Sequence, residues 1–479
     1  MERMHSQLSV AWCVPLLSCA FLGMYLEACE GAQNPSPPAP APVEAGARVE
    51  ASEPAPLRLE ESIASLRPML GLACSAAESP SQQSLDAVAE RAYAQGRLEQ
   101  ALCCQRLSAP QNLSAEHYLI HGRGLLDAKQ VEQARELLIQ GERRFLGDPR
   151  FAPLIERSID EDPRYAPPIR QLHPDVDLDA IKQLGGGSTI VLRFIKDGET
   201  FAAFKPKQKR LQSDPRAEIA AWRLCPLIRC GFNIPYNQPV KLRWRDFDGL
   251  YSRIRSESQL AYRANFEDLS LVKEDGVDWV LGVQKDWVPS FTDFPIELTQ
   301  LWRGWLSLEN GEEILEGEAR SILSAVRKLH PKGEKLERQL EQHMGELSRR
   351  DFARQLSNLL AFDFLINNWD RFSGVPEFWG VNCQFKDGAL LSIDNGAAFP
   401  RTPNVKVEKQ LHRVQRFSRQ LVAAVRALEH DKTLARLWPE ATPFEKERFE
   451  TFWAQRQLFL DYVDALIASH GEAAVLCFE

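Results

Sequence analysis

The chain has 479 residues, which is enough for two or three domains rather than one. Its 44% hydrophobic and 26% charged residues are ordinary values for a globular protein. The net charge of -8 argues against a nucleic-acid-binding protein, which usually carries a basic face. No apolar run beyond the N-terminus is long enough to cross a bilayer, so we expect the body of the chain to be soluble.

Residues 1–33 show the features of a secretory signal in the usual order: a positive charge, an apolar stretch and then small residues. Cys19 and Cys29 each stand where a lipoprotein signal places its lipidated cysteine, and a cleaved signal or an uncleaved anchor is also compatible with the pattern. We expect an exported protein, which is lipid-anchored at a membrane surface, periplasmic, or in a secretory lumen or the extracellular space. A membrane tether is expected through the N-terminus only, and the ten cysteines leave disulfide pairing open.

A linker and a helical region follow. Residues 34–56 are rich in Pro and Ala and are predicted to form an extended, solvated spacer. Residues 57–160 are predicted to be an all-α domain, in which Ala101 and Ala134 end two similar segments 33 residues apart, close to the tetratricopeptide period. Two degenerate tetratricopeptide-like units and a plain helical packing domain both fit this pattern. A protein partner, if there is one, is expected to bind through residues 80–150.

The pattern changes at residue 181, and residues 181–479 are predicted to form the main domain. Strand-like runs come first, and long helical segments follow. The expected strands are 189–195, 200–204, 239–244 and 389–393, and the expected helices are 217–227, 317–329, 333–348 and 351–367. We therefore expect an α+β fold with two lobes, the first built on a mixed sheet and the second mostly helical, although many α+β proteins share this order.

The first part of this domain contains three features that suit a phosphate-bearing ligand. The glycine run Gly185, Gly186 and Gly187, followed by Ser188, precedes a strand and would let backbone N–H groups face a phosphate, although such runs are usually plain turns. Lys205 ends an apolar strand, where its ammonium could contact nucleotide phosphates or extend to solvent. Glu218 stands on an amphipathic helix and could pair with that lysine, or it could simply be an acid favoured by the helix dipole.

The second part of this domain contains two carboxylates, each of which directly follows a predicted helix or strand. An apolar helix ends at two asparagines and leads into Asp370, and a short strand leads into Asp394 and a turn at Gly396. One carboxylate can accept a hydroxyl proton while the other holds a metal ion that bridges phosphates. Each motif alone is a common ion pair or turn. Their order after Lys205 and Glu218 predicts phosphoryl transfer.

These motifs resemble those of the secretory-pathway kinases, the family that includes the Golgi casein kinase, the proteoglycan xylosylkinase and four-jointed. The shared features are a Phe-Lys-Pro strand end, an Ala-Glu-Ile-Ala-Ala helix, a Phe-Asp-Phe-Leu segment leading to Asp-Arg, and an Asp-Asn-Gly motif, and residues 282–289 resemble a further family segment. The resemblance implies an atypical kinase fold that binds ATP with Mg²⁺ or Mn²⁺. It implies phosphate contact by Lys205, pairing or metal support by Glu218, a catalytic base at Asp370 and a metal ligand at Asp394.

The chain departs from the family pattern after the Asp-Arg motif. Phe372 and Ser373 replace a pair of histidines, residues 373–380 are rearranged, and Asn382 is expected as a second metal ligand. These departures put the acceptor site in doubt more than the nucleotide site. Transfer to protein Ser/Thr is the first expectation and transfer to a sugar hydroxyl the second. An inactive nucleotide-binding or scaffold protein, with a partner bound by the helical region, and a phosphoinositide-kinase-like enzyme are the alternatives.

Overall fold

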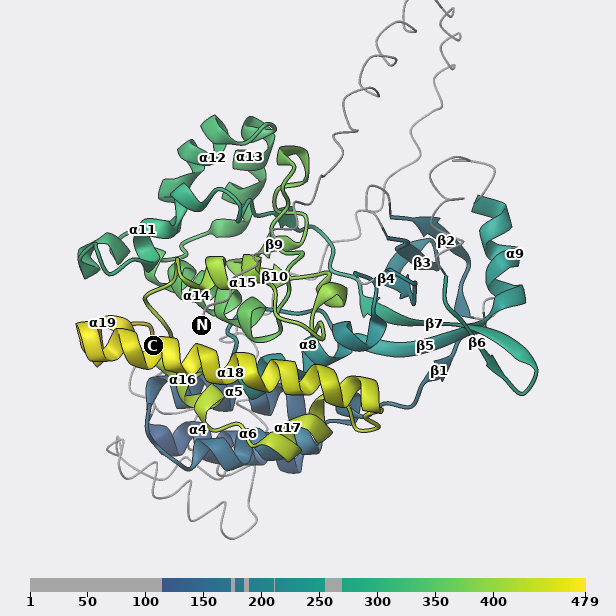
Figure 1. Cartoon of the computed structure of the whole chain (residues 1–479), viewed down its shortest axis with the longest axis horizontal. Coiled ribbons are helices and arrows are strands. Elements are labelled where there is room, and N and C mark those ends of the chain that lie inside the picture. Colours follow the sequence, from purple (N-terminus) through teal and green to yellow (C-terminus); the bar gives the residue numbers. More distant parts are fainter. Residues whose placement is uncertain (1–113, 174–176, 185–188, 211, 255–268) are drawn as a thin grey trace, which may run out of the picture. The chain divides into compact units, whose positions relative to one another are not determined.

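The computed structural model describes residues 114–479 except 174–176, 185–188, 211 and 255–268. The expected leader at 1–33, the linker at 34–56 and the first of the two repeat-like units lie outside the described residues. The glycine run Gly185, Gly186 and Gly187 and the following Ser188 also lie outside them. The described part is α+β, as expected, with a mixed sheet and many helices (Figure 1).

The elements of the described part follow the chain in this order. The strands are β1 (Arg170–Gln171), β2 (Ala180–Gln183), β3 (Leu192–Lys196), β4 (Glu199–Pro206), β5 (Asn237–Arg243), β6 (Leu271–Glu274), β7 (Val277–Asp286), β8 (Thr292–Asp293), β9 (Cys383–Lys386) and β10 (Ala389–Ser392). The helices are α4 (Ala115–Asp127), α5 (Val131–Arg144), α6 (Phe151–Asp160), α8 (Pro215–Leu227), α9 (Trp244–Ile254), α11 (Arg303–Leu306), α12 (Leu323–Leu329), α13 (Gly333–Met344), α14 (Arg349–Leu365), α15 (Val405–Leu411), α16 (Arg419–Arg426), α17 (His430–Leu437), α18 (Pro443–His470) and α19 (Glu472–Val475).

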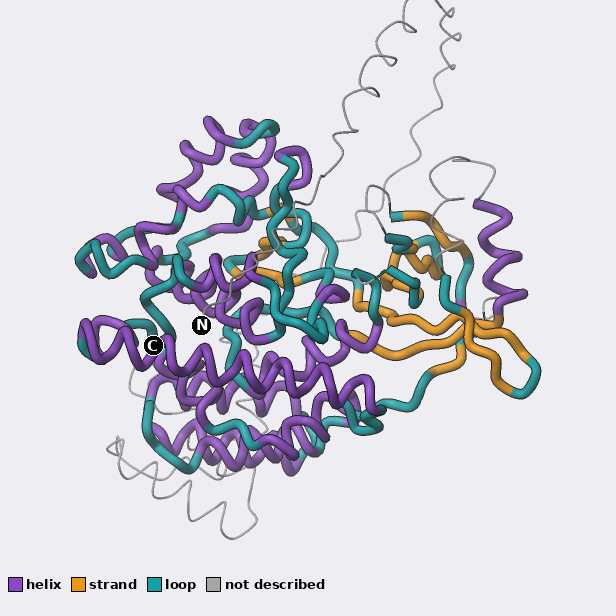
Figure 2. Tube along the Cα trace, in the orientation of Figure 1, coloured by secondary structure: helices purple, strands orange, loops and turns teal. Residues whose placement is uncertain are grey.

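The large sheet has the strand order β1-β5-β7-β4-β3-β2, and β6 pairs with β7. The β1–β5 pair is parallel and the other pairs are antiparallel, so the sheet is mixed. Asp-Gly turns with positive φ connect β3 to β4 at Asp197 and β6 to β7 at Asp275, as hairpins require. Helix α9 packs on β2, β5 and β7 (Figure 2). Its Phe247 lies with Phe194 and Phe204 in one hydrophobic core.

A second and larger core lies among the helices. Helix α14 runs through it, and every residue of α14 from Phe352 to Leu365 is buried. The helix begins at Ser348, whose hydroxyl accepts from the N–H of Asp351 at 3.0 Å, a normal N-terminal cap. It contacts α15, α18 and β10. The small sheet β10-β9-β8 therefore packs against α14. The segment after β10 meets the C-terminal end of α14, where the N–H of Phe399 donates to the backbone oxygen of Ile366.

The described part of the helical region, α4 to α6, packs on the main domain rather than apart from it. Glycines at 122 and 141 allow α4 and α5 to approach closely, because a Cβ on either would overlap the facing helix. Glu142 on α5 accepts from Arg229 (3.0 Å) and Gln420 (2.8 Å), and Arg436 on α17 donates to Asp160 (2.8 Å). These contacts tie α5 and α6 to α16, α17 and the end of α8.

Several boundaries differ from the sequence-based expectations. The sheet already begins at β1, before residue 181, and the expected strand at 239–244 ends one residue early because α9 begins at Trp244. Strand β7, which extends through the 282–286 segment, was not among the expected strands. A disulfide joins Cys225 to Cys230 at the end of α8. Among the described residues, no helix is both long and apolar enough to cross a membrane.

Candidate functional site

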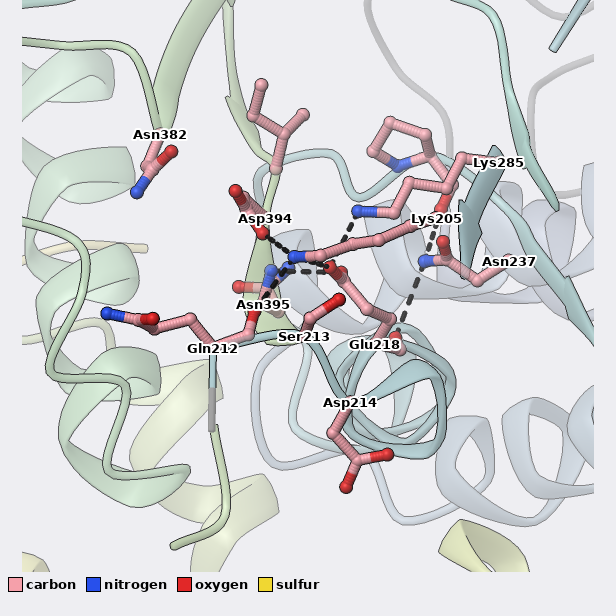
Figure 3. Close-up of polar contacts among 12 residues, drawn as sticks. Lys205, Gln212, Ser213, Asp214, Glu218, Asn237, Lys285, Asn382, Asp394 and Asn395 are labelled. Atoms are coloured by element: carbon pink, nitrogen blue, oxygen red, sulfur yellow. Dashed lines mark hydrogen bonds and ion pairs between the residues drawn. The ribbon is translucent and has the colours of Figure 1, made fainter. Parts of the chain in front are cut away.

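Lys205 is fully buried near the end of β4, the strand that lies between β3 and β7 in the large sheet. Its Nζ lies 3.2 Å from Glu218 Oε1 and 2.9 Å from the carbonyl oxygen of Gln212, and it also contacts Asp394 Oδ1 (Figure 3). An ammonium group has three N–H donors, and each of these three acceptors can receive one. The side chain is therefore held inside the site and does not extend to solvent.

Glu218 reaches this point from the first turn of α8. The helix begins at Asp214, whose carboxylate accepts from the N–H of Arg216 at 3.0 Å, and Pro215 occupies the first helical position. This start turns Glu218 inward, where it is 1% exposed. Its Oε2 accepts from the N–H of Asn395 at 2.9 Å, so the helix also fixes the turn after Asp394. A plain helix-dipole role does not account for these contacts.

The charges around Lys205 determine the protonation states of this cluster. Burial alone would lower the pKa of Lys205, but Asp394 and Glu218 overcome that effect and raise it above its usual value. Burial would likewise raise the pKa of Asp394, but Lys205 and Lys285 hold it below its usual range. Both groups are therefore charged at neutral pH.

Asp394 and Gly396 form the turn that follows β10. Asp394 adopts the left-handed conformation (φ 57°, ψ 56°), which is uncommon for a residue other than glycine and frequent at functional sites. The turn passes so close to Lys205 that a Cβ on Gly396 would lie 2.8 Å from Lys205 Nζ and 2.6 Å from the Gln212 oxygen. Only a glycine fits at this position without displacing the lysine or the backbone beside it.

Replacing Gly396 with alanine should therefore destabilise the fold by about 1–3 kcal/mol, the usual cost of an extra methyl group in a packed site. Urea unfolding of the Gly396→Ala variant measures this loss. Gly374→Ala is the matched control, because a Cβ there has no neighbour within 4 Å, and it should change stability by less than about 0.5 kcal/mol. Equal stability of the two variants would contradict the close approach.

Asp370 lies in the turn beyond α14, next to Asp394. Burial and then the negative charge of Asp394 raise the pKa of Asp370 to about 6, although Lys205 and Arg371 oppose the shift. Asn382 donates from Nδ2 to the backbone oxygen of Asp370 at 2.7 Å. In Figure 3 its amide oxygen lies on the side that faces Asp394. This bond ties the loop that carries Asp370 to the start of β9.

Arg371 is buried, with 1% exposed, and it connects the loop that carries Asp370 to the turn that carries Asp394. It donates to both carboxylate oxygens of Asp363 on α14, at 2.9 and 3.0 Å, so the Asp-Arg motif is not a local ion pair with Asp370. It also donates to the backbone oxygen of Ile393 (2.9 Å) and to the side-chain oxygen of Asn395 (2.8 Å). The guanidinium group therefore fixes the loops that carry Asp370 and Asp394 to one helix.

Arg448, on the long helix α18, supports the other side of the Asp394 turn. It donates to the backbone oxygens of Ala398 (2.8 Å) and Phe399, and it pairs with Asp214 at the start of α8. A residue near the end of the chain therefore helps to orient both Glu218 and Asp394. No local sequence motif marked Arg448, and the Asp-Arg motif did not show which partners Arg371 has.

The rearranged loop after Arg371 is held by Glu297. Its two carboxylate oxygens accept from the N–H groups of Ser373 (2.9 Å) and Gly380 (3.0 Å), which fixes both ends of the loop. Burial raises the pKa of Glu297 to about 7, against these hydrogen bonds and the charge of Arg371. A cavity of about 140 Å³ lies between this part of the chain and α15, and its lining includes Trp369, Phe372, Lys406, Val407, Lys409 and Arg413 but not Asp370.

The structure thus brings Lys205, Glu218 and Asp394 into direct contact and places Asp370 and Asn382 beside them. It also adds Lys285, whose Nζ lies 2.7 Å from Glu218 Oε1 and which the site residues expected from the sequence did not include. Lys285 lies in the 282–289 segment that resembles a family segment, but the strand that carries it, β7, was not expected from the sequence. Chemically, the cluster offers cations for phosphate oxygens, oxygen ligands for a metal ion and a carboxylate with a raised pKa.

No protein-family model matches this chain, and a comparison with the curated proteins finds no match either.

Proposed function

We propose that this chain is an exported, two-lobed, atypical kinase that transfers the γ-phosphoryl group of ATP to a hydroxyl group. The observation that carries the proposal is the direct contact of Lys205 with Glu218 and Asp394, three residues from β4, α8 and the turn after β10. Asp370, with its raised pKa, lies beside this contact. Phosphoryl transfer needs the same groups: a lysine oriented by a helical glutamate, a metal-binding aspartate and a base.

The roles follow from the chemistry of each group. Lys205 would contact the nucleotide phosphates, and Glu218 would hold Lys205 in place. Asp370 would accept the proton of the acceptor hydroxyl, since its pKa lies close to neutral pH. We expect the acceptor to be a protein Ser/Thr first and a sugar hydroxyl second. The export expected from residues 1–33 remains part of the proposal.

The oxygen donors at the site fit a bound Mg²⁺ or Mn²⁺. The side chain of Asp394 is 30% exposed and accessible to a ligand, and Asn382 uses its nitrogen for Asp370, which leaves its oxygen for a metal. Mg²⁺ is usually held by one or two carboxylates together with substrate phosphates and waters. The ion would supply positive charge between the phosphate groups. Asp394 and Asn382 would hold it.

Thermal unfolding with and without ATP and Mg²⁺ or Mn²⁺ tests the nucleotide site without knowledge of the acceptor. ATP at a hundred times its dissociation constant should add about 2.7 kcal/mol of stability and raise the melting temperature by a few degrees. Asp394→Ala should abolish this shift, and the exposed Asp278→Ala on β7 should keep it. No shift in the wild type with any nucleotide or metal would contradict the proposal.

Transfer assays with labelled ATP then separate the remaining functions. Labelled protein or sugar would support the kinase. Label in phosphoinositide vesicles alone would favour a lipid kinase. Nucleotide binding without transfer to any of these acceptors would favour an inactive nucleotide-binding or scaffold protein.

A further inference from the structure

Lys285 is the second lysine that contacts Glu218, and it has no role in the site as proposed above. It stands on β7, directly opposite Ala203 of β4. Residues paired across two strands share a face of the sheet, and so do residues two apart on one strand. Lys285 and Lys205 therefore project from the same face. Figure 3 shows their ammonium groups extending in the same direction, toward Glu218 and Asp394.

The two lysines differ in how many of their donors are used. Lys205 is 0% exposed, and its three donors meet three acceptors. Lys285 keeps 13% of its side chain exposed, and within the described residues its ammonium has one partner, Glu218 Oε1 at 2.7 Å. An ammonium group carries three donors, so two remain for a ligand. Lys285, rather than Lys205, is the lysine with donors to spare.

The charge of the cluster also favours an anion at Lys285. Lys205 and Lys285 balance Glu218 and Asp394 in the protein alone. A metal ion on Asp394 would neutralise that carboxylate. The two positive charges of Lys205 and Lys285 would then exceed the single negative charge of Glu218. Lys285 also lowers the pKa of Asp394, so its positive charge acts on that carboxylate.

Resting on the proposed function, we propose that Lys285 is a second phosphate-binding lysine that donates to an oxygen of the nucleotide polyphosphate. Glu218 orients it through Oε1, the same oxygen that orients Lys205. In the protein alone Lys205 joins Glu218 to the Asp394 turn, so Lys285 supplies the donors that are still unused when the phosphate chain reaches the two lysines. The competing role is purely structural, in which Lys285 only neutralises the buried Glu218.

Calorimetric binding of ATP, ADP and adenosine to the full chain with Mg²⁺ distinguishes these roles. Lys285→Gln keeps a donor for Glu218 but removes the charge, and Lys285→Arg keeps the charge. The affinity of Lys285→Gln for ATP should fall about tenfold or more, as expected for the loss of a hydrogen bond to a charged group. Its affinity for adenosine should stay within about twofold, and Lys285→Arg should bind ATP nearly as the wild type does.

Lys241→Gln is the matched control, since Lys241 is also a strand lysine paired with a glutamate, Glu274, on the same sheet. It should bind ATP as the wild type does. An equal loss for ATP and adenosine in Lys285→Gln, or no loss for ATP, would overturn the role of Lys285 and leave the kinase proposal intact. A wild-type chain that binds none of the three ligands would instead overturn the proposed function and this inference with it.

Discussion

Asp370→Asn is expected to lower phosphoryl transfer by about 10²–10⁴-fold, the usual contribution of a general base. Asparagine keeps the size of the side chain but cannot accept the hydroxyl proton. ATP binding with Mg²⁺ should change little, because Asp394, Asn382 and the lysines remain. Rate measurements with labelled ATP, beside thermal unfolding with ATP, separate the two effects.

The wild-type rate should also depend on pH in one direction. Because burial and Asp394 raise the pKa of Asp370 to about 6, kcat/KM should fall as the pH is lowered through about 6, where the base becomes protonated. Lys406 opposes this shift. Lys406→Met should therefore move the fall in rate to higher pH. An unchanged profile in that variant would show that another group titrates.

Asp387→Asn is the control for Asp370→Asn. Asp387 is an exposed aspartate in the turn between β9 and β10, and its left-handed conformation also suits asparagine. It should leave transfer unchanged. Wild-type activity in Asp370→Asn would remove Asp370 from the mechanism.

The second large effect concerns stability. Arg371→Met should destabilise the chain by about 3–5 kcal/mol, because it leaves the buried carboxylate of Asp363 without its partner. It also removes the hydrogen bonds to Ile393 and Asn395, so the Asp394 turn should lose its position. Urea unfolding measures the first effect, and loss of metal-dependent ATP binding in folded protein measures the second.

Two comparisons make this result specific. Arg426 pairs with Asp464 at the surface, and Arg426→Met should cost no more than about 1 kcal/mol. Asp363→Asn combined with Arg371→Met should cost less than the two single changes added together, because the double variant leaves no unpaired charge. Additive losses would mean that the two side chains do not act as a pair.

The elements around the site were largely predictable, because local sequence determines them. Asp214 and Pro215 mark the start of α8, and the apolar run before Asp370 marks α14. The hairpin between β6 and β7 was missed, although the Asp-Gly pair at Asp275 was a usable signal. The expected start of the main domain at 181 excluded β1, since a two-residue strand has no pattern of its own.

The sequence by itself identified Lys205, Glu218, Asp370 and Asp394 as candidates for one site, in the order that phosphoryl transfer suggests. Short-range patterns were enough because they mark the strand or helix next to each residue. Only the tertiary structure decided their partners. Lys205 and Asp394 are 189 residues apart along the chain, and no local pattern encodes a contact at that separation. For the same reason the sequence did not show the partners of Arg371, Arg448 and Lys285. A buried charge is stable only where the fold surrounds it with partners, and those partners come from elements that meet only in the folded chain.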